Sequence, residues 1–266
     1  MNIAFARILS FSVMIIIGIS FVQTANAQLD TTFGTNGTVV TDFNGDDRLI
    51  DSFVLPDSKI LTVVAGTLNG QTRYYLARYN SNGTLDAGYG TNGIKQLSFP
   101  AVPNAVFIRA ARQSSGKIIL GGSNGANGLV VSLNEDGTLN TAFAGGGIQQ
   151  PNFNPTGDDK VDALGVQPDD KIVISSAFSA FQSSQYLYFA RYLPDGTLDS
   201  TFGDGGTIYT TNPPSNVINT ILFQSNGKII TLGTAIRRLN ADGRMDNSFP
   251  TIVNPYRDSE ISFPLI

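Results

Sequence analysis

The chain has 266 residues with no cysteine, no histidine and no tryptophan, and its 17 Lys and Arg against 21 Asp and Glu give a formal net charge of -4. Without histidine and cysteine, Ser-His-Asp and Cys-His nucleophile systems are excluded, and sites for zinc, copper, haem or iron–sulfur clusters lack their usual ligands. The acidic balance argues against a nucleic-acid or anionic-membrane partner, because both need a clustered basic surface.

The first 27 residues are predicted to be a secretory signal peptide. A basic residue, Arg7, precedes an apolar run from Ile8 to Val22, and the small-x-small sequence Ala25-Asn26-Ala27 follows it. The run has 15 residues, three of them serine, whereas a helix that spans a bilayer needs about 20. We therefore expect cleavage near Ala27, no stable membrane insertion, and a mature chain that is secreted or lies in the periplasm or on the cell surface.

Residues 28–253 form one unit repeated at a period of about 55 residues. A Leu-Asp-x-x-Phe-Gly motif begins at Leu29, Leu85, Leu139, Leu198 and, in weaker form, Met245. A second motif of the Gln-Pro-Asp-Gly-Lys-Ile type places its lysines at Lys59, Lys117, Lys171 and Lys228. A third motif, of the Ala-Arg-Tyr type, ends in an Asp-Gly or Asn-Gly turn just before the first motif begins again.

Each repeat is predicted to contain four short antiparallel strands and almost no helix. In the repeat that follows Asp162 the strands lie near 162–166, 171–176, 186–192 and 207–210, with turns at Pro168-Asp169-Asp170 and Pro194-Asp195-Gly196 between them. Continuous apolar runs such as 118–122 indicate strands that are covered on both faces. A four-stranded unit of this size fits a β-propeller blade better than a turn of a solenoid.

The three linked motifs resemble the delta-60 repeat family, a bacterial extracellular repeat. The resemblance covers Leu29 to about Phe249 and implies an all-β chain built of propeller blades, with no known activity. The third and fifth copies depart from the pattern, with Asn140 in place of Asp, and Ala144 and Pro250 in place of Gly.

The strands add up to about four complete blades and a partial fifth. The N-terminal copy supplies one lone outer strand near Thr38 to Phe43, and the tail, residues 254–266, resembles the start of a further blade. We expect an incomplete propeller, either from a truncated reading frame or as an open arc covered by its tail or by another chain. Unpaired blade edges make self-association an additional expectation.

One repeated pair of charges is predicted to form an ion pair within the blade. A three-residue loop such as Pro194-Asp195-Gly196 places the residue three before it opposite the residue three after it. The pairs are Arg78 with Asp86, Arg191 with Asp199, and Arg238 with Asp246; in the remaining copy both charges are absent together, leaving Ser132 and Asn140. Each pair should contribute about 0.2–1 kcal/mol, and independently solvated charges are the alternative.

The repeated aromatic residues are expected to be core residues between blades, not ligand platforms. They are Phe33, Tyr89, Phe143 and Phe202.

Function is expected where the repeats differ, and acidic loops are the first candidates. One loop carries Asp42, Asn44, Asp46, Asp47 and Asp51, and Asp158-Asp159 correspond to Asp46-Asp47 in another repeat. The loop begins like an EF-hand, but Asp47 stands where glycine is required and Phe53 stands at position 12. Calcium is thus a minor alternative to solvated turn carboxylates. We assign no catalytic, cofactor-binding or metal-binding residue and expect no cofactor.

Two function classes stay open. The preferred one is a secreted, non-enzymatic propeller scaffold that binds a protein or glycan surface. The alternative is a carboxylate-dependent polysaccharide hydrolase or lyase, which needs two carboxylates about 5 to 10 Å apart in a pocket. A cluster of non-repeated acids around the central opening would favour the enzyme, and a flat repeated rim would favour the binder.

Overall fold

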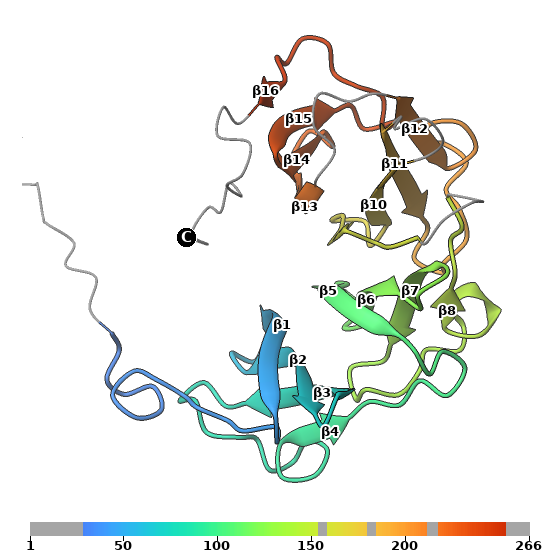
Figure 1. Cartoon of the computed structure of the whole chain (residues 1–266). Helices are drawn as coiled ribbons and strands as arrows, with labels where there is room; N and C mark the ends of the chain where they lie inside the picture. Colours follow the sequence, from blue (N-terminus) through green and yellow to red (C-terminus); the bar gives the residue numbers. More distant parts are fainter. Residues whose placement is uncertain (1–28, 154–158, 180–184, 212–217, 254–266) are drawn as a thin grey trace, which may run out of the picture. The chain divides into compact units, whose positions relative to one another are not determined.

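The computed structural model describes residues 29–153, 159–179, 185–211 and 218–253 (Figure 1). The chain divides into two compact units, Met1–Val39 and Val40–Ile266, which are described separately. The predicted signal peptide, residues 1–27, and the tail expected to start a further blade, residues 254–266, lie outside the described residues.

The described part of the first unit, residues 29–39, is a turn. Asp30 Oδ1 accepts hydrogen bonds from the backbone nitrogen and the hydroxyl of Thr32, at 2.9 and 2.6 Å. Isolated bridges join Thr38 to Gly34 and Thr35. Phe33 is half-buried.

The prediction of an outer strand near Thr38 to Phe43 is wrong, because residues 39–43 form no strand. Side chains take the backbone donors at the end of this segment. Asp47 Oδ2 accepts from the Phe43 nitrogen at 2.8 Å, and Asp42 Oδ1 accepts from the Asn44 nitrogen at 2.7 Å. Such local bonds compete with the pairing of strands.

The second unit contains four sheets, and in each one four antiparallel strands follow one another in chain order (Figure 1). Blade 1 comprises β1 (Asp46–Val54), β2 (Ile60–Leu68), β3 (Gln71–Tyr79) and β4 (Ile94–Gln96). Blade 2 comprises β5 (Val106–Arg112), β6 (Ile118–Ser123), β7 (Gly128–Leu133) and β8 (Ile148–Gln149). Blade 3 comprises β9 (Ala163–Val166), β10 (Ile172–Ser179), β11 (Gln185–Tyr192) and β12 (Thr207–Thr211). Blade 4 comprises β13 (Ile218–Phe223), β14 (Ile229–Gly233), β15 (Ala235–Leu239) and β16 (Ile252–Val253).

These sheets confirm the predicted all-β fold of four-stranded blades. The one helix in the described ranges is a 3-10 turn, η1 (Phe143–Gly145). Accordingly, none of the described segments contains a helix long and apolar enough to cross a membrane.

Successive blades pack face to face through their apolar side chains. Ile118 and Leu120 of β6 belong to a cluster shared with blade 1, whereas Ile119 between them belongs to a cluster shared with blade 3. A third cluster joins blade 3 to blade 4. The alternation follows from strand geometry, in which consecutive side chains point to opposite faces. It confirms the expectation that the continuous apolar runs are covered on both sides.

Three of the four repeated aromatic residues, Tyr89, Phe143 and Phe202, pack in the clusters between blades, as predicted. Phe143 and Phe202 are fully buried, and Tyr89 is nearly so. The ring of Phe202 lies against the turn glycine of the next blade, Gly243, where an added Cβ would approach the ring to 2.4 Å. Gly243 has φ +87°, so both its conformation and its close contact favour glycine.

Candidate functional site

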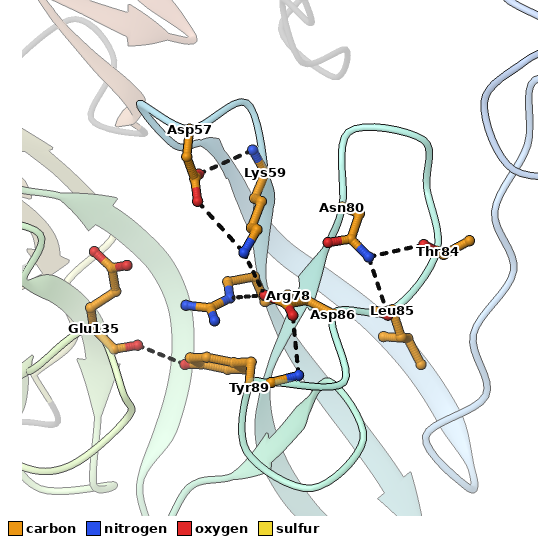
Figure 2. A network of polar contacts seen from close by, with 10 residues as sticks. Asp57, Lys59, Arg78, Asn80, Thr84, Leu85, Asp86, Tyr89 and Glu135 are labelled. Atoms are coloured by element: carbon orange, nitrogen blue, oxygen red, sulfur yellow. Dashed lines mark hydrogen bonds and ion pairs between the residues drawn. The ribbon is translucent and has the colours of Figure 1, made fainter.

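Blades 1, 3 and 4 carry the predicted ion pair, and Figure 2 shows the pair of blade 1. The arginine Nε lies 2.8 Å from the aspartate Oδ2 in Arg78–Asp86, 2.8 Å in Arg191–Asp199 and 2.7 Å in Arg238–Asp246. In blade 2 a neutral hydrogen bond replaces it, because Asn140 Nδ2 donates to Ser132 Oγ at 3.0 Å. The turn geometry therefore predicted the three ion pairs correctly, and the hydrogen bond of blade 2 shows that the same two positions face each other there.

A lysine from the second motif completes each charged site, which the sequence reasoning missed. Lys59, Lys171 and Lys228 place Nζ at 3.0, 3.1 and 2.6 Å from the same aspartate Oδ2 that meets the arginine. The signal was available, since these lysines recur at the same period as the aspartates. We call each arginine, aspartate and lysine set a charge network.

Each charge network also covers the repeated aromatic residue of its blade. The guanidinium carbon lies 4.4 Å from the ring centre in Arg78–Tyr89, and 4.7 Å in both Arg191–Phe202 and Arg238–Phe249. The side chains of Arg191 and Asp199 are only 7% and 4% exposed. For this pair the alternative of independently solvated charges is wrong.

The surroundings of the three aspartates keep them ionised. The hydrogen bond from Lys59 is the main cause that holds the pKa of Asp86 below its ordinary value, and the bond from Lys228 does the same for the pKa of Asp246. Burial raises the pKa of Asp199, but hydrogen bonds from Thr201 and Lys171 and the charge of Arg191 outweigh burial and lower it. Carboxylates bound in this way are poor general acids, and the ion pairs link strands within each blade.

A cavity of about 660 Å³ lies where the first strands of the four blades end, and we call it the axial cavity. Apolar side chains from all four first strands line it: Phe53, Ala110, Leu164, Val166, Leu222 and Phe223. The polar lining includes Asp51, Arg112, Gln113 and Thr220. Sequence reasoning did not identify these residues as a group, because only the packing of blades brings them together.

Asp51 and Asp170 are the acids among the described residues that line the axial cavity. Burial raises the pKa of Asp51. Asp170 has φ +65° at a turn position that Gly116 and Gly227 occupy in other blades. Its two carboxylate oxygens accept hydrogen bonds from the backbone nitrogen and the hydroxyl of Ser114, at 2.6 and 2.8 Å. Asp170 thus joins blade 3 to blade 2 at the rim, which offsets its unfavourable backbone conformation.

The acidic loops bind backbone nitrogens instead of converging on a metal. Asp159 Oδ2 accepts from the Phe153 nitrogen at 3.0 Å, just as Asp47 accepts from the Phe43 nitrogen. The sequence correspondence between Asp47 and Asp159 is therefore real, and both hold a buried phenylalanine in place. Asp158 lies outside the described residues. Within the described ranges no group of three or more His, Cys, Asp or Glu side chains is placed to hold a metal ion.

Three segments of the chain match a family model described as a domain of unknown function (DUF5122) beta-propeller, namely residues 55–89, 167–202 and 224–249. They fall in blades 1, 3 and 4, the blades that carry a charge network. No curated protein matches the chain. A crystal structure of a protein of unknown function from Dyadobacter fermentans DSM 18053 matches with 12% identity and a TM-score of 0.46. The match covers 76% of this chain and 63% of that one, so this chain spans less than two thirds of its length.

Proposed function

We propose that this β-propeller is an exported, non-enzymatic scaffold that binds a protein or glycan surface at the axial cavity. The observation that carries the proposal is a contrast in sequence between two parts of the same blades. The charge networks repeat, whereas the cavity lining varies. At the position six residues before the repeated lysine, all four blades contribute a different residue to the cavity: Phe53, Ala111, Gly165 and Leu222.

The chemistry of the lining supports binding. An apolar concave surface with a few polar groups is the usual form of a ligand site. Leu222 is 49% exposed there, and exposed apolar groups rimmed by polar residues are typical of interaction surfaces. A binding scaffold needs this combination and no reactive group.

The alternative, a carboxylate-dependent polysaccharide hydrolase or lyase, has weaker support. Asp51 has the raised pKa that a general acid needs. A glycosidase also needs a second carboxylate that can act as base or nucleophile. Asp170, the other acid of the lining, has both oxygens bound to Ser114, so it is poorly suited to that role.

A glycan-array and pull-down screen of the mature protein tests the proposal, with calcium and with chelator. The blocking variant is Thr220→Arg, which places a long charged side chain at an exposed position of the cavity lining. Its matched control is Gln96→Arg, at the exposed last residue of the outer strand β4. We expect binding that Thr220→Arg abolishes and Gln96→Arg preserves. Release of reducing ends from a polysaccharide, lost in Asp51→Asn, would instead establish the enzyme.

A further inference from the structure

A second cavity, of about 330 Å³, lies between blades 1 and 2 and is distinct from the axial cavity. We call it the arginine cavity. Its described lining consists of Arg78, Gly88, Tyr89, Gly90, Glu135 and Asp136. The first three belong to the charge network of blade 1 or adjoin it, and the two acids belong to the turn of blade 2. The cavity therefore forms at the place where the blade 1 network meets the next blade.

At the corresponding position between blades 3 and 4, all three guanidinium nitrogens of Arg191 make hydrogen bonds. Arg191 Nε binds Asp199, Nη1 donates to the Ala241 carbonyl at 2.6 Å, and Nη2 donates to Thr201 Oγ1 at 3.1 Å. A hydroxyl of the same blade and a carbonyl of the next blade thus complete the shell around this arginine. The result is a closed contact, with the arginine side chain 7% exposed.

Two sequence differences leave the corresponding arginine of blade 1 open. Gly88 stands where blade 3 has Thr201, which removes the hydroxyl. The Glu135 carbonyl, the counterpart of the Ala241 carbonyl, instead accepts a hydrogen bond from the Tyr89 hydroxyl at 2.7 Å. Burial raises the pKa of Tyr89, which keeps this donor protonated.

As a result, the terminal nitrogens of Arg78 make no hydrogen bond to any residue that the structure describes, and only Nε is bound, to Asp86 at 2.8 Å. Figure 2 shows the outer end of the guanidinium directed away from Asp86, on the side where Glu135 lies. A planar pair of donors therefore borders the arginine cavity.

The charges around the cavity select the ligand. Arg78 supplies donors and disfavours a cation. Glu135 Oε2 is paired with Arg112 Nη2 at 3.0 Å, and Asp136 Oδ1 accepts from Thr138 at 2.9 and 2.6 Å, so Glu135 Oε1 and Asp136 Oδ2 are the acceptors left for a ligand. The side chain of Glu135 is 39% exposed, and the hydrogen bonds from Thr138 hold the pKa of Asp136 below its ordinary value, which disfavours an anion. A neutral ligand with neighbouring hydroxyl groups satisfies both kinds of group, because each hydroxyl can accept from the guanidinium and donate to a carboxylate.

We infer that the arginine cavity binds one neutral hexose unit of a glycan through its hydroxyl groups. The volume of about 330 Å³ lies at the lower end of the range of about 300–1,000 Å³ for small-molecule pockets, which suits a single sugar ring. The inference does not depend on the axial cavity, so the two proposals fail separately.

The decisive variant is Gly88→Thr, which gives blade 1 the threonine of blade 3. Gly88 does not have a left-handed backbone, and the nearest atom to an added Cβ is Asp86 Oδ1 at 3.4 Å, an ordinary contact. The new hydroxyl would bind Arg78 Nη2 and occupy the cavity. Ala87→Thr is the matched control, because Ala87 is the exposed neighbouring residue and lies outside the cavity lining.

The measurement is a ligand-observed NMR titration of the mature chain with neutral methyl hexosides, with a uronic acid and an amino sugar as charged probes. We expect at least one neutral hexoside to bind more tightly than both charged probes. Gly88→Thr should weaken its binding by about tenfold or more, equivalent to about 1.4 kcal/mol, with an unchanged melting temperature, while Ala87→Thr and Thr220→Arg bind like the wild type. Tyr89→Phe removes the hydroxyl that donates to the Glu135 carbonyl, so that this carbonyl can accept a hydrogen bond from Arg78 instead. This variant should also weaken binding, and it takes the place of Gly88→Thr if that variant does not fold.

Three results would overturn the inference: no binding of any neutral hexoside, tighter binding of the uronic acid, or equal binding by the wild type and a folded Gly88→Thr protein. Loss of array binding in Thr220→Arg without any effect in Gly88→Thr would support the axial cavity alone.

Discussion

Removal of the Asp199 carboxylate should destabilise the protein through the charges that it leaves behind. The carboxylate meets Arg191 Nε at 2.8 Å and Lys171 Nζ at 3.1 Å. It also accepts hydrogen bonds from the nitrogen and hydroxyl of Thr201, at 3.1 and 2.6 Å. In Asp199→Ala, Arg191 stays 93% buried without its counter-charge, which typically costs about 3–5 kcal/mol for a fully buried pair. Because Lys171 borders solvent and screening reduces the loss, we expect the free energy of unfolding to fall by about 2–3 kcal/mol.

Urea denaturation followed by circular dichroism measures this loss, since the chain has no tryptophan to serve as a fluorescent probe. Asp86→Ala is the first control. Its pair is more exposed, with side chains 20% and 13% exposed, so its loss should be smaller. The double variant Arg191→Ser/Asp199→Asn copies the neutral pair of blade 2 and should recover part of the loss of Asp199→Ala. A loss at Asp199 below about 0.5 kcal/mol, the range of ordinary surface substitutions, would refute the reasoning.

The remaining predictions concern the contacts between blades and the response to pH. Gly243→Ala should lower stability by about 1–3 kcal/mol, because the new Cβ meets the Phe202 ring at 2.4 Å in a left-handed conformation; an unchanged melting temperature would show that the blades do not pack in this way. Ser114→Ala should cost about 1 kcal/mol by removing the hydroxyl that binds Asp170 Oδ2 while the backbone bond to Oδ1 remains, and a neutral effect in the same melt would show that the hydroxyl adds nothing to this link. The pKa values of Asp86, Asp199 and Asp246 are lowered in the folded chain, so their contribution is fully present above the unfolded pKa of about 4 and is lost as the pH falls below it. A melting temperature that is level from pH 5 to 8 and falls below about pH 4 fits this sign, and one that rises on acidification contradicts it.

The ion pairs could be predicted from sequence because a short turn fixes which residues face each other. The contact of Lys59 with the same aspartate could not be predicted from a turn in this way. Lys59 precedes β2, and it reaches the network because Leu61 pairs with Arg78 across β2 and β3. That register depends on the hairpin between the two strands, which in blade 1 turns at Asn69 and Gly70, at the other end of β2 from Lys59. The residues that face each other across a short turn follow from a few neighbouring positions, whereas the register between two strands depends on residues farther away in the sequence.

The acidic loops show a different limit. The equal spacing of Asp47 and Asp159 from their lysines correctly indicated a shared role, but residue type alone suggested calcium. Both carboxylates bind the backbone nitrogen of a buried phenylalanine, and the Asp47 bond occupies a backbone donor of Phe43 in the segment where a strand was expected and none forms. Both candidate binding sites were also beyond sequence reasoning, because residues from separate blades meet only after the blades pack.

The most direct test of this account compares partner binding in Thr220→Arg and Asp199→Ala, at a temperature where both variants are folded. The ligand is the strongest array or pull-down partner of the wild type. The account predicts that Thr220→Arg loses binding and keeps its stability, whereas Asp199→Ala loses stability and keeps its affinity. Binding that survives in Thr220→Arg and disappears in folded Asp199→Ala would contradict it, because the repeated charge network and not the axial cavity would then be the binding site.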